Sequence, residues 1–179
     1  MRQFSAAKCA IMALLTLAPT MVKAAETPCF TPAEFTAMAT YALPSLITGV
    51  AQKCSVTLPA TSFLRSSGAD LATRYALAKT AAWPATKTAF VRVILSAKPE
   101  MAELAKSLPE EMQQQMVDTA LGTIISEKLP ADRCTSVDRL VQLLSPLPAE
   151  NTAELIGLAV GLGNKATGGK PSKLPICGA

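Results

Sequence analysis

The sequence predicts an all-α fold, a compact helical bundle of about seven helices that disulfides stabilise. Three observations predict it. Helix-start signals, in which Ser or Thr and Pro precede an acidic residue, recur along the chain. The apolar residues that follow them return every three or four positions, which places them on one helix face. Four cysteines lie beyond an N-terminal export signal, an even number in a compartment that permits disulfides.

The first 24 residues have the order of a cleaved secretory signal peptide. The basic residues Arg2 and Lys8 precede a stretch, residues 9–22, that carries no charge. Cleavage after Ala24 leaves small residues at the −3 and −1 positions, whereas cleavage after Ala25 would put a lysine at −3. We therefore expect cleavage between Ala24 and Ala25, and a periplasmic or secreted protein.

The alternative to a signal peptide is an uncleaved membrane anchor. The uncharged stretch is interrupted by Pro19 and is shorter than the roughly 20 residues that span a bilayer. We therefore expect no stable membrane insertion after signal cleavage. Cleavage also removes three of the 17 basic residues and none of the 13 acidic ones, which leaves 14 basic residues and a net charge of +1. A near-neutral charge argues against nucleic acid as a partner, because binding it needs a clustered basic surface.

The first predicted helix covers residues 32–53. Thr31 supplies an N-cap hydroxyl, Pro32 suits the first helical position and Glu34 completes a capping box. Apolar residues then recur on one face, and Pro44 is expected to kink the helix without ending it. The other possibility is a chain that folds back at Pro44 into a helical hairpin.

Later start signals predict the remaining helices. A capping box at residues 107–110 begins the clearest of them, with Met112 and Met116 on its buried face and Gln113 and Asp118 in water. The other predicted helices cover residues 71–82, 85–97, 99–107, 137–144 and 149–162.

The segment Phe90–Leu95 is rich in β-branched residues that also suit a strand. With helix signals on both sides and no second strand-like run, we interpret it as a buried helix. The predicted domain covers residues 25–163 as one helical unit. Residues 164–179 form a flexible tail that is tethered by Cys177.

The candidate disulfide cysteines are Cys29, Cys54, Cys134 and Cys177. A continuous helix over residues 32–53 is about 30 Å long, whereas disulfide partners have Cα atoms within about 7 Å. Cys29 could then not pair with Cys54, and two long-range pairings remain: Cys54 to Cys134 with Cys29 to Cys177, or the crossed set. A hairpin at Pro44 would instead allow Cys29 to pair with Cys54. No two of these cysteines are close in sequence and the chain has no histidine, so we expect no metal and no cofactor.

The absence of histidine also excludes Ser-His-Asp and Cys-His catalysis. Arg92 is the candidate ligand anchor, because it lies in an apolar run and could bind a ligand carboxylate or phosphate. We favour a structural role over this one: an ion pair with a glutamate of a neighbouring helix, or a side chain that lies along the surface with its guanidinium in water. We expect a non-enzymatic binding role, with an unknown protein or a small apolar ligand as partner. The alternative is an enzyme that uses carboxylates or Arg92.

Overall fold

The computed structural model describes residues 29–97, 99–166 and 176–177. Within these ranges it has eight α-helices, one 3-10 helix and no strand, which confirms the predicted all-α class. The helices in chain order are α1 Pro32–Cys54, α2 Phe63–Ser66, α3 Gly68–Ala76, α4 Lys79–Ala97, α5 Pro99–Ser107, α6 Glu110–Lys128, η1 Ala131–Arg133, α7 Cys134–Leu144 and α8 Ala149–Ala166.

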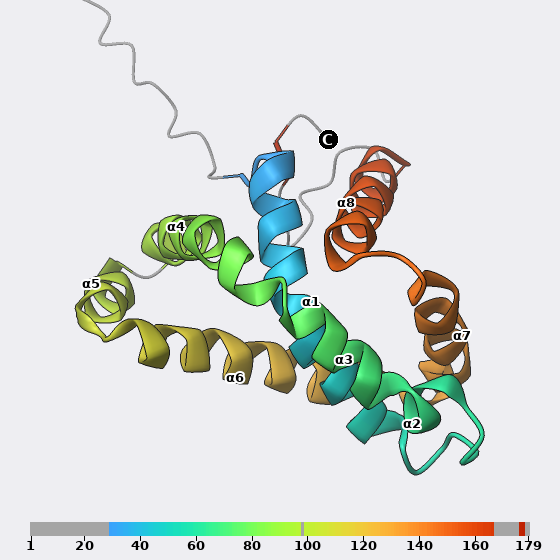
Figure 1. Ribbon diagram of the computed structural model, residues 1–179. Coiled ribbons are helices and arrows are strands. Elements are labelled where there is room, and N and C mark those ends of the chain that lie inside the picture. The colour runs from blue at the N-terminus through green and yellow to red at the C-terminus, as the bar shows by residue number, and fades with distance from the viewer. Residues whose placement is uncertain (1–28, 98, 167–175, 178–179) are drawn as a thin grey trace, which may run out of the picture.

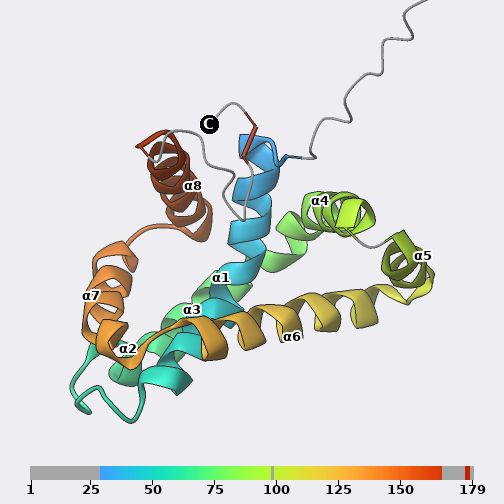
Figure 2. The same cartoon turned by 180° about the vertical axis from the view of Figure 1, so that it is seen from behind.

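Helix α1 is the central element. It runs through the middle of the molecule, and α3, α4, α6 and α8 all pack against it (Figure 1). Seen from behind, α7 and α8 lie on one side of α1 while α5 lies at the far end of the other side (Figure 2). Its 23 residues correspond to about 34 Å of helix. The predicted continuous first helix is confirmed, and the hairpin at Pro44 does not occur because Pro44 lies inside α1.

The start of α1 forms as its sequence predicts. The Thr31 side chain accepts a hydrogen bond from the Glu34 amide at 3.2 Å, and the Thr31 amide donates to Glu34 Oε2 at 2.9 Å. Two amides that the helix leaves unpaired are thereby satisfied, with Pro32 at the first helical position.

The predicted boundary at Pro84 is wrong. Helix α3 ends at Ala76, α4 begins at Lys79, and Pro84 lies inside α4. Pro84 removes only one helical hydrogen bond, and the helical path through it buries Ala82 and Trp83 against Tyr41. The segment that contains Phe90–Leu95 is helical, as predicted, and belongs to the same α4.

The predicted faces of α6 are also wrong in part. Gln113 is 6% exposed and Met112 is 49% exposed, the reverse of the expectation. The buried amide is satisfied, because Gln113 Nε2 donates to the Leu108 carbonyl at 2.9 Å. Val117 shares the buried face. A polar side chain that reaches a free carbonyl beyond the end of α5 can thus replace an apolar one in a buried position.

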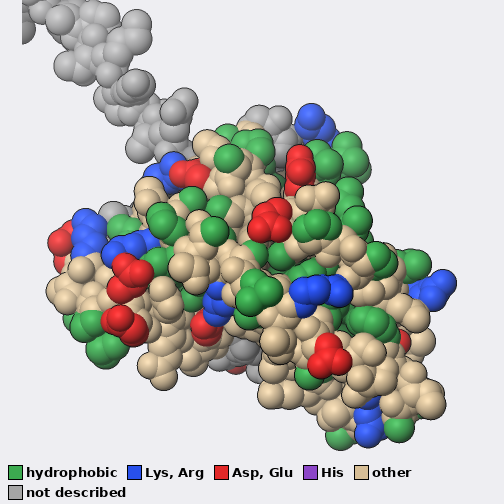
Figure 3. Space-filling view, in the orientation of Figure 1, with side chains coloured by type: hydrophobic (Ala, Val, Ile, Leu, Met, Phe, Trp, Pro, Cys, Tyr) green, Lys and Arg blue, Asp and Glu red, His purple; other side chains and the backbone are tan. Residues whose placement is uncertain are grey.

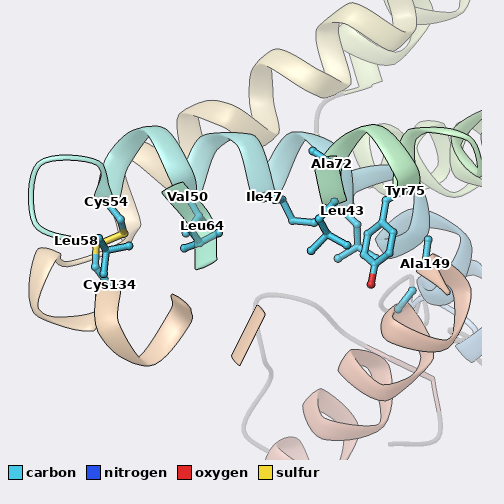
Figure 4. Close-up of a cluster of buried hydrophobic side chains, with 12 residues drawn as sticks. Leu43, Ile47, Val50, Cys54, Leu58, Leu64, Ala72, Tyr75, Cys134 and Ala149 are labelled. Carbon is cyan, nitrogen blue, oxygen red and sulfur yellow. A yellow bond between two sulfur atoms is a disulfide. The ribbon is translucent and has the colours of Figure 1, made fainter. Parts of the chain in front are cut away.

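The main core lies along α1 and extends to α3, α7 and α8. Leu43, Ile47 and Val50 project from α1 into this cluster, and Tyr75 lies at its other end beside Ala149 (Figure 4). The Tyr75 hydroxyl lies 2.9 Å from Thr152 Oγ1 and 3.0 Å from the Leu147 carbonyl. The buried phenol therefore joins α3 to the start of α8 with its hydrogen bonds satisfied.

Two disulfides tie the two ends of α1 to distant parts of the chain. Cys54 pairs with Cys134 at the start of α7, and both are buried in the core. Cys29 pairs with Cys177, beside an isolated bridge between Phe30 and Ile176. One of the two long-range pairings left open by the sequence is thus confirmed, and the crossed set is not formed.

Candidate functional site

A groove of about 750 Å³ lies between α1, α8 and the start of α4. Small side chains form most of its walls. Ala33, Thr36, Ala37 and Thr40 of α1 line one side, and Ala78, Ala81 and Ala82 contribute from the α4 side. The other wall comes from α8, by Gly157, Leu158, Gly161 and Leu162. Because most of these residues have no more than a methyl group, the helices enclose open space where larger side chains would fill it.

Helices α1 and α8 are antiparallel and meet closely at one point of the groove. A Cβ atom on Gly157 would lie 3.0 Å from Phe35 Cδ1, so the glycine allows the Phe35 ring to pack against the α8 backbone. Towards the start of α8, Ala149 and Ala153 join the main core with Leu43. Close helix packing accounts for Gly157, whereas Gly161 lines the groove.

The α8 wall exposes large apolar side chains. Leu158 is 59% exposed and Leu162 is 68% exposed, and both line the groove. Leu155 on the next turn is 46% exposed. Figure 3 shows hydrophobic side chains gathered over α8 at the upper right of the view. Removing apolar surface from water is favourable by about 25 cal/mol per Å². Coverage of these exposed leucines by a ligand or a protein would therefore be favourable.

Thr40 is the most buried of the polar residues that line the groove. It is 2% exposed, and among the described residues its hydroxyl has no hydrogen-bond partner. Pro44 follows four positions later and has no amide hydrogen to donate to the Thr40 carbonyl. A buried hydroxyl without a partner costs about 1–3 kcal/mol.

The charged residues of the groove lie on its rim. Glu150 and Glu154 are exposed near the start of α8, and Lys165 is exposed near its end. Since α8 is antiparallel to α1, the two glutamates lie towards Thr40, and Lys165 lies towards Pro32. The floor of the groove is therefore uncharged, with acidic groups at one end and a basic group at the other.

The outer disulfide forms one edge of the groove. Ile176 and Cys177 line it, and the Cys177 amide donates to the Phe30 carbonyl at 2.8 Å. The Cys29–Cys177 bond holds this edge against the start of α1. The groove is thus built from segments far apart in the sequence.

Arg92 does not line the groove. Its Nη2 lies 2.6 Å from Glu34 Oε2 and 2.9 Å from the Cys29 carbonyl. The ion pair with a neighbouring helix, one of the roles considered from the sequence, is present. Burial alone would raise the pKa of Glu34, but hydrogen bonds from Thr31 and Arg92 outweigh it and lower that pKa. A role for Arg92 as a ligand anchor stays a prediction.

A second polar cluster joins α1, α4 and α6. Lys79 Nζ lies 2.8 Å from Asp118 Oδ2, and the Ser45 hydroxyl donates to Asp118 Oδ1 at 2.8 Å. The Lys79 ammonium also lies 4.4 Å from the centre of the Tyr41 ring. Each of these charged or polar groups is engaged by another, so the cluster holds three helices together.

The remaining sequence predictions concern other features. The predicted cleavage residues Ala24 and Ala25 lie outside the described residues. In the ranges that the structure covers, no helix is long and apolar enough to cross a membrane. No group of three or more Cys, Asp or Glu side chains in those ranges could hold a metal ion.

The chain matches no protein-family model, and comparisons with curated proteins and with solved structures return no significant match. The groove therefore has to be interpreted from its own chemistry. Sequence reasoning did not identify it, because it depends on how α8 meets α1. One signal did exist in the sequence, namely Thr40 four residues before Pro44, within a stretch of the first helix, residues 36–52, that has no charged side chain.

Proposed function

We propose that this protein is an exported binding protein that holds a small apolar ligand in the groove between α1, α4 and α8. One observation carries the proposal, namely a groove of about 750 Å³ of which alanine, glycine and leucine form half of the lining residues. This volume lies within the range of about 300–1,000 Å³ that is typical of small-molecule sites, which are mostly apolar with few polar groups.

Two further features support the proposal. Leu158 and Leu162 would lose exposed apolar surface to a ligand, which is a favourable change. The two disulfides indicate a non-reducing compartment and fix both ends of α1, so the groove is built before the ligand arrives. The predicted signal peptide agrees with export to the periplasm or the medium.

A groove-filling substitution tests the proposal. Gly161→Leu places a side chain in the groove, and helix propensity favours leucine over glycine at this helical position. Gly163→Leu is the matched control on the same helix, because a Cβ atom there meets nothing within 4 Å. The probe is the neutral fluorophore N-phenyl-1-naphthylamine, titrated into the purified mature protein, with light scattering to report the oligomeric state.

We expect saturable binding of one probe per chain, weakened about tenfold or more by Gly161→Leu and unchanged by Gly163→Leu. No saturable binding, or equal binding by both variants, would overturn the proposal. A self-association that buries the groove and is lost in Gly161→Leu would instead assign the leucines to a protein interface, which also contradicts a ligand site.

A further inference from the structure

We propose that the groove selects an uncharged amphipathic ligand, a long-chain alcohol or a similar molecule, whose one hydrogen-bonding group is held by Thr40. This inference rests on the proposed function and adds the chemical class and the orientation of the ligand. Its starting point is that Thr40 lies on the groove wall, is 2% exposed, and has a hydroxyl with no partner among the described residues.

The other buried threonines of the described chain do not share this property. Thr86 is 1% exposed, and its hydroxyl donates to the Ala82 carbonyl at 2.8 Å. The hydroxyl of Thr152 lies 2.9 Å from that of Tyr75. Since buried hydroxyls in folded proteins are nearly always satisfied, the one that lies at the groove is the one that a ligand would satisfy.

In the present rotamer, protein atoms cover the Thr40 hydroxyl. A threonine in a helix populates two χ1 rotamers, so a rotation about the Cα–Cβ bond would present the hydroxyl to a ligand without a change in the backbone. The Thr40 carbonyl adds an acceptor nearby, because Pro44 has no amide hydrogen to donate to it. A ligand hydroxyl could then donate to the carbonyl and accept from the side chain.

The charges around the groove favour a neutral head group at this end. Glu150 and Glu154 lie on the rim towards Thr40, so a ligand carboxylate there would face like charges. Lys165 lies at the opposite end, beside Pro32 and Cys177. The apolar part of the ligand would run from Thr40 past Gly157 along Leu158 and Leu162.

The test uses three ligands with the same ten-carbon chain and different head groups. Their affinities are measured for the wild type and for variants that lack a single threonine hydroxyl. 1-Decanol, 1-bromodecane and decanoate each compete with N-phenyl-1-naphthylamine for the mature protein. Thr40→Val keeps the shape of the side chain and removes the hydroxyl. Thr86→Val is the matched control, a buried threonine whose hydroxyl is already bonded.

We expect the wild type to prefer 1-decanol over 1-bromodecane, and Thr40→Val to lose about 3- to 10-fold in decanol affinity, the worth of one hydrogen bond. Bromodecane affinity should not change in Thr40→Val, and Thr86→Val should bind both as the wild type does. Thr40→Val should also melt no lower than the wild type, because the hydroxyl that it removes has no partner, whereas Thr86→Val should melt lower.

The outcomes separate this inference from the proposed function. If decanol and bromodecane both bind and Thr40→Val leaves their ratio unchanged, the assignment of Thr40 is wrong while the ligand site stands. Tighter binding of decanoate that is lost in Lys165→Met would place the head group at the other end and overturn the inference. If no member of the series competes and the probe itself does not bind, the proposed function fails.

Discussion

Tyr41 packs against Ala82, Trp83 and Val117 and carries a buried hydroxyl that has no hydrogen-bond partner among the described residues. It is 1% exposed, its ring centre lies 5.1 Å from that of Trp83, and neither the phenol oxygen nor the indole nitrogen has a partner in the described residues. Burial, with a smaller contribution from the charge of Asp118, raises the pKa of Tyr41 to about 12. The folded state therefore keeps this phenol neutral at pH values where an unfolded chain ionises it.

The consequence is a loss of stability in strong alkali. The contribution of Tyr41 is fully present below pH 10, because the phenol is then neutral in both states, and it is lost as pH rises towards 12. By linkage, the free energy of unfolding should fall by about 1–2 kcal/mol between pH 9 and pH 11 through this group. Tyr41→Phe should show a fall that is smaller by this amount. Denaturant unfolding followed by circular dichroism at both pH values measures it, and identical falls in the two proteins would contradict the assignment.

Contacts between neighbours in the sequence were predictable, whereas contacts between helices were not. The capping box of Thr31 and Glu34 was predicted because its groups are neighbours along the chain. The partner of Arg92 was named only as a glutamate on another helix, and the pairing of Lys79 with Asp118 was not identified at all. These contacts depend on how α1, α4 and α6 cross, which no spacing along one helix encodes.

Among the helices, α8 shows how position decides what a glycine does. Gly157→Leu should lower the free energy of unfolding by more than about 1 kcal/mol. The reason is that a Cβ atom at this position lies only 3.0 Å from Cδ1 of the buried Phe35 ring, which leaves no room for a leucine side chain. Gly163→Ala should raise it by up to about 1 kcal/mol, because alanine is the better helix former and its Cβ meets nothing within 4 Å. Thermal and denaturant unfolding of the two variants check the signs, and a stabilising Gly157→Leu would mean that α8 does not pack on Phe35.

The predicted helices were correct where start signals and apolar periodicity agree, as in α1. The start predicted at residue 137 is wrong, because α7 begins at Cys134 without a side-chain cap. The predictions were wrong where the burial of side chains between helices outweighs a local helix-start signal. Pro84 reads as a helix start, yet the burial of Trp83 keeps that turn helical within α4. Helix α2 was missed because its four residues have no side-chain cap and too few positions for a periodic pattern. Helix α8 continues to Ala166, beyond the predicted end of the domain at residue 163.

For the molecule as a whole, the two disulfides differ in access. Cys54 and Cys134 are 0% and 1% exposed, whereas Cys29 and Cys177 are half-buried at the groove edge. Because reduction needs a thiolate or a phosphine to reach a sulfur atom, the outer bond should be reduced first. Partial reduction followed by alkylation and peptide mass spectrometry should label Cys29 and Cys177 before the inner pair. Prior labelling of Cys54 and Cys134 would show that the core opens more easily than the edge.

The sequence predicted the fold class and reduced the disulfides of a continuous first helix to two possible long-range sets, but it did not predict the groove. The length of the first helix can be calculated from the sequence, and it keeps Cys29 too far from Cys54 for a disulfide. The groove depends on the position of α8 relative to α1, to which the close approach of Gly157 to Phe35 and the packing of Ala153 near Leu43 contribute. The candidate site is therefore a property of the packed helices.

The pairing of Cys29 with Cys177 has a covalent consequence as well. Their Cα atoms lie 5.1 Å apart, so residues 29–177 form a closed ring, and the Cys54–Cys134 bond closes a smaller ring inside it. A protease that cuts one peptide bond anywhere between residues 29 and 177 opens a ring without releasing a fragment. A single cut by a protease therefore leaves every helix attached to the others.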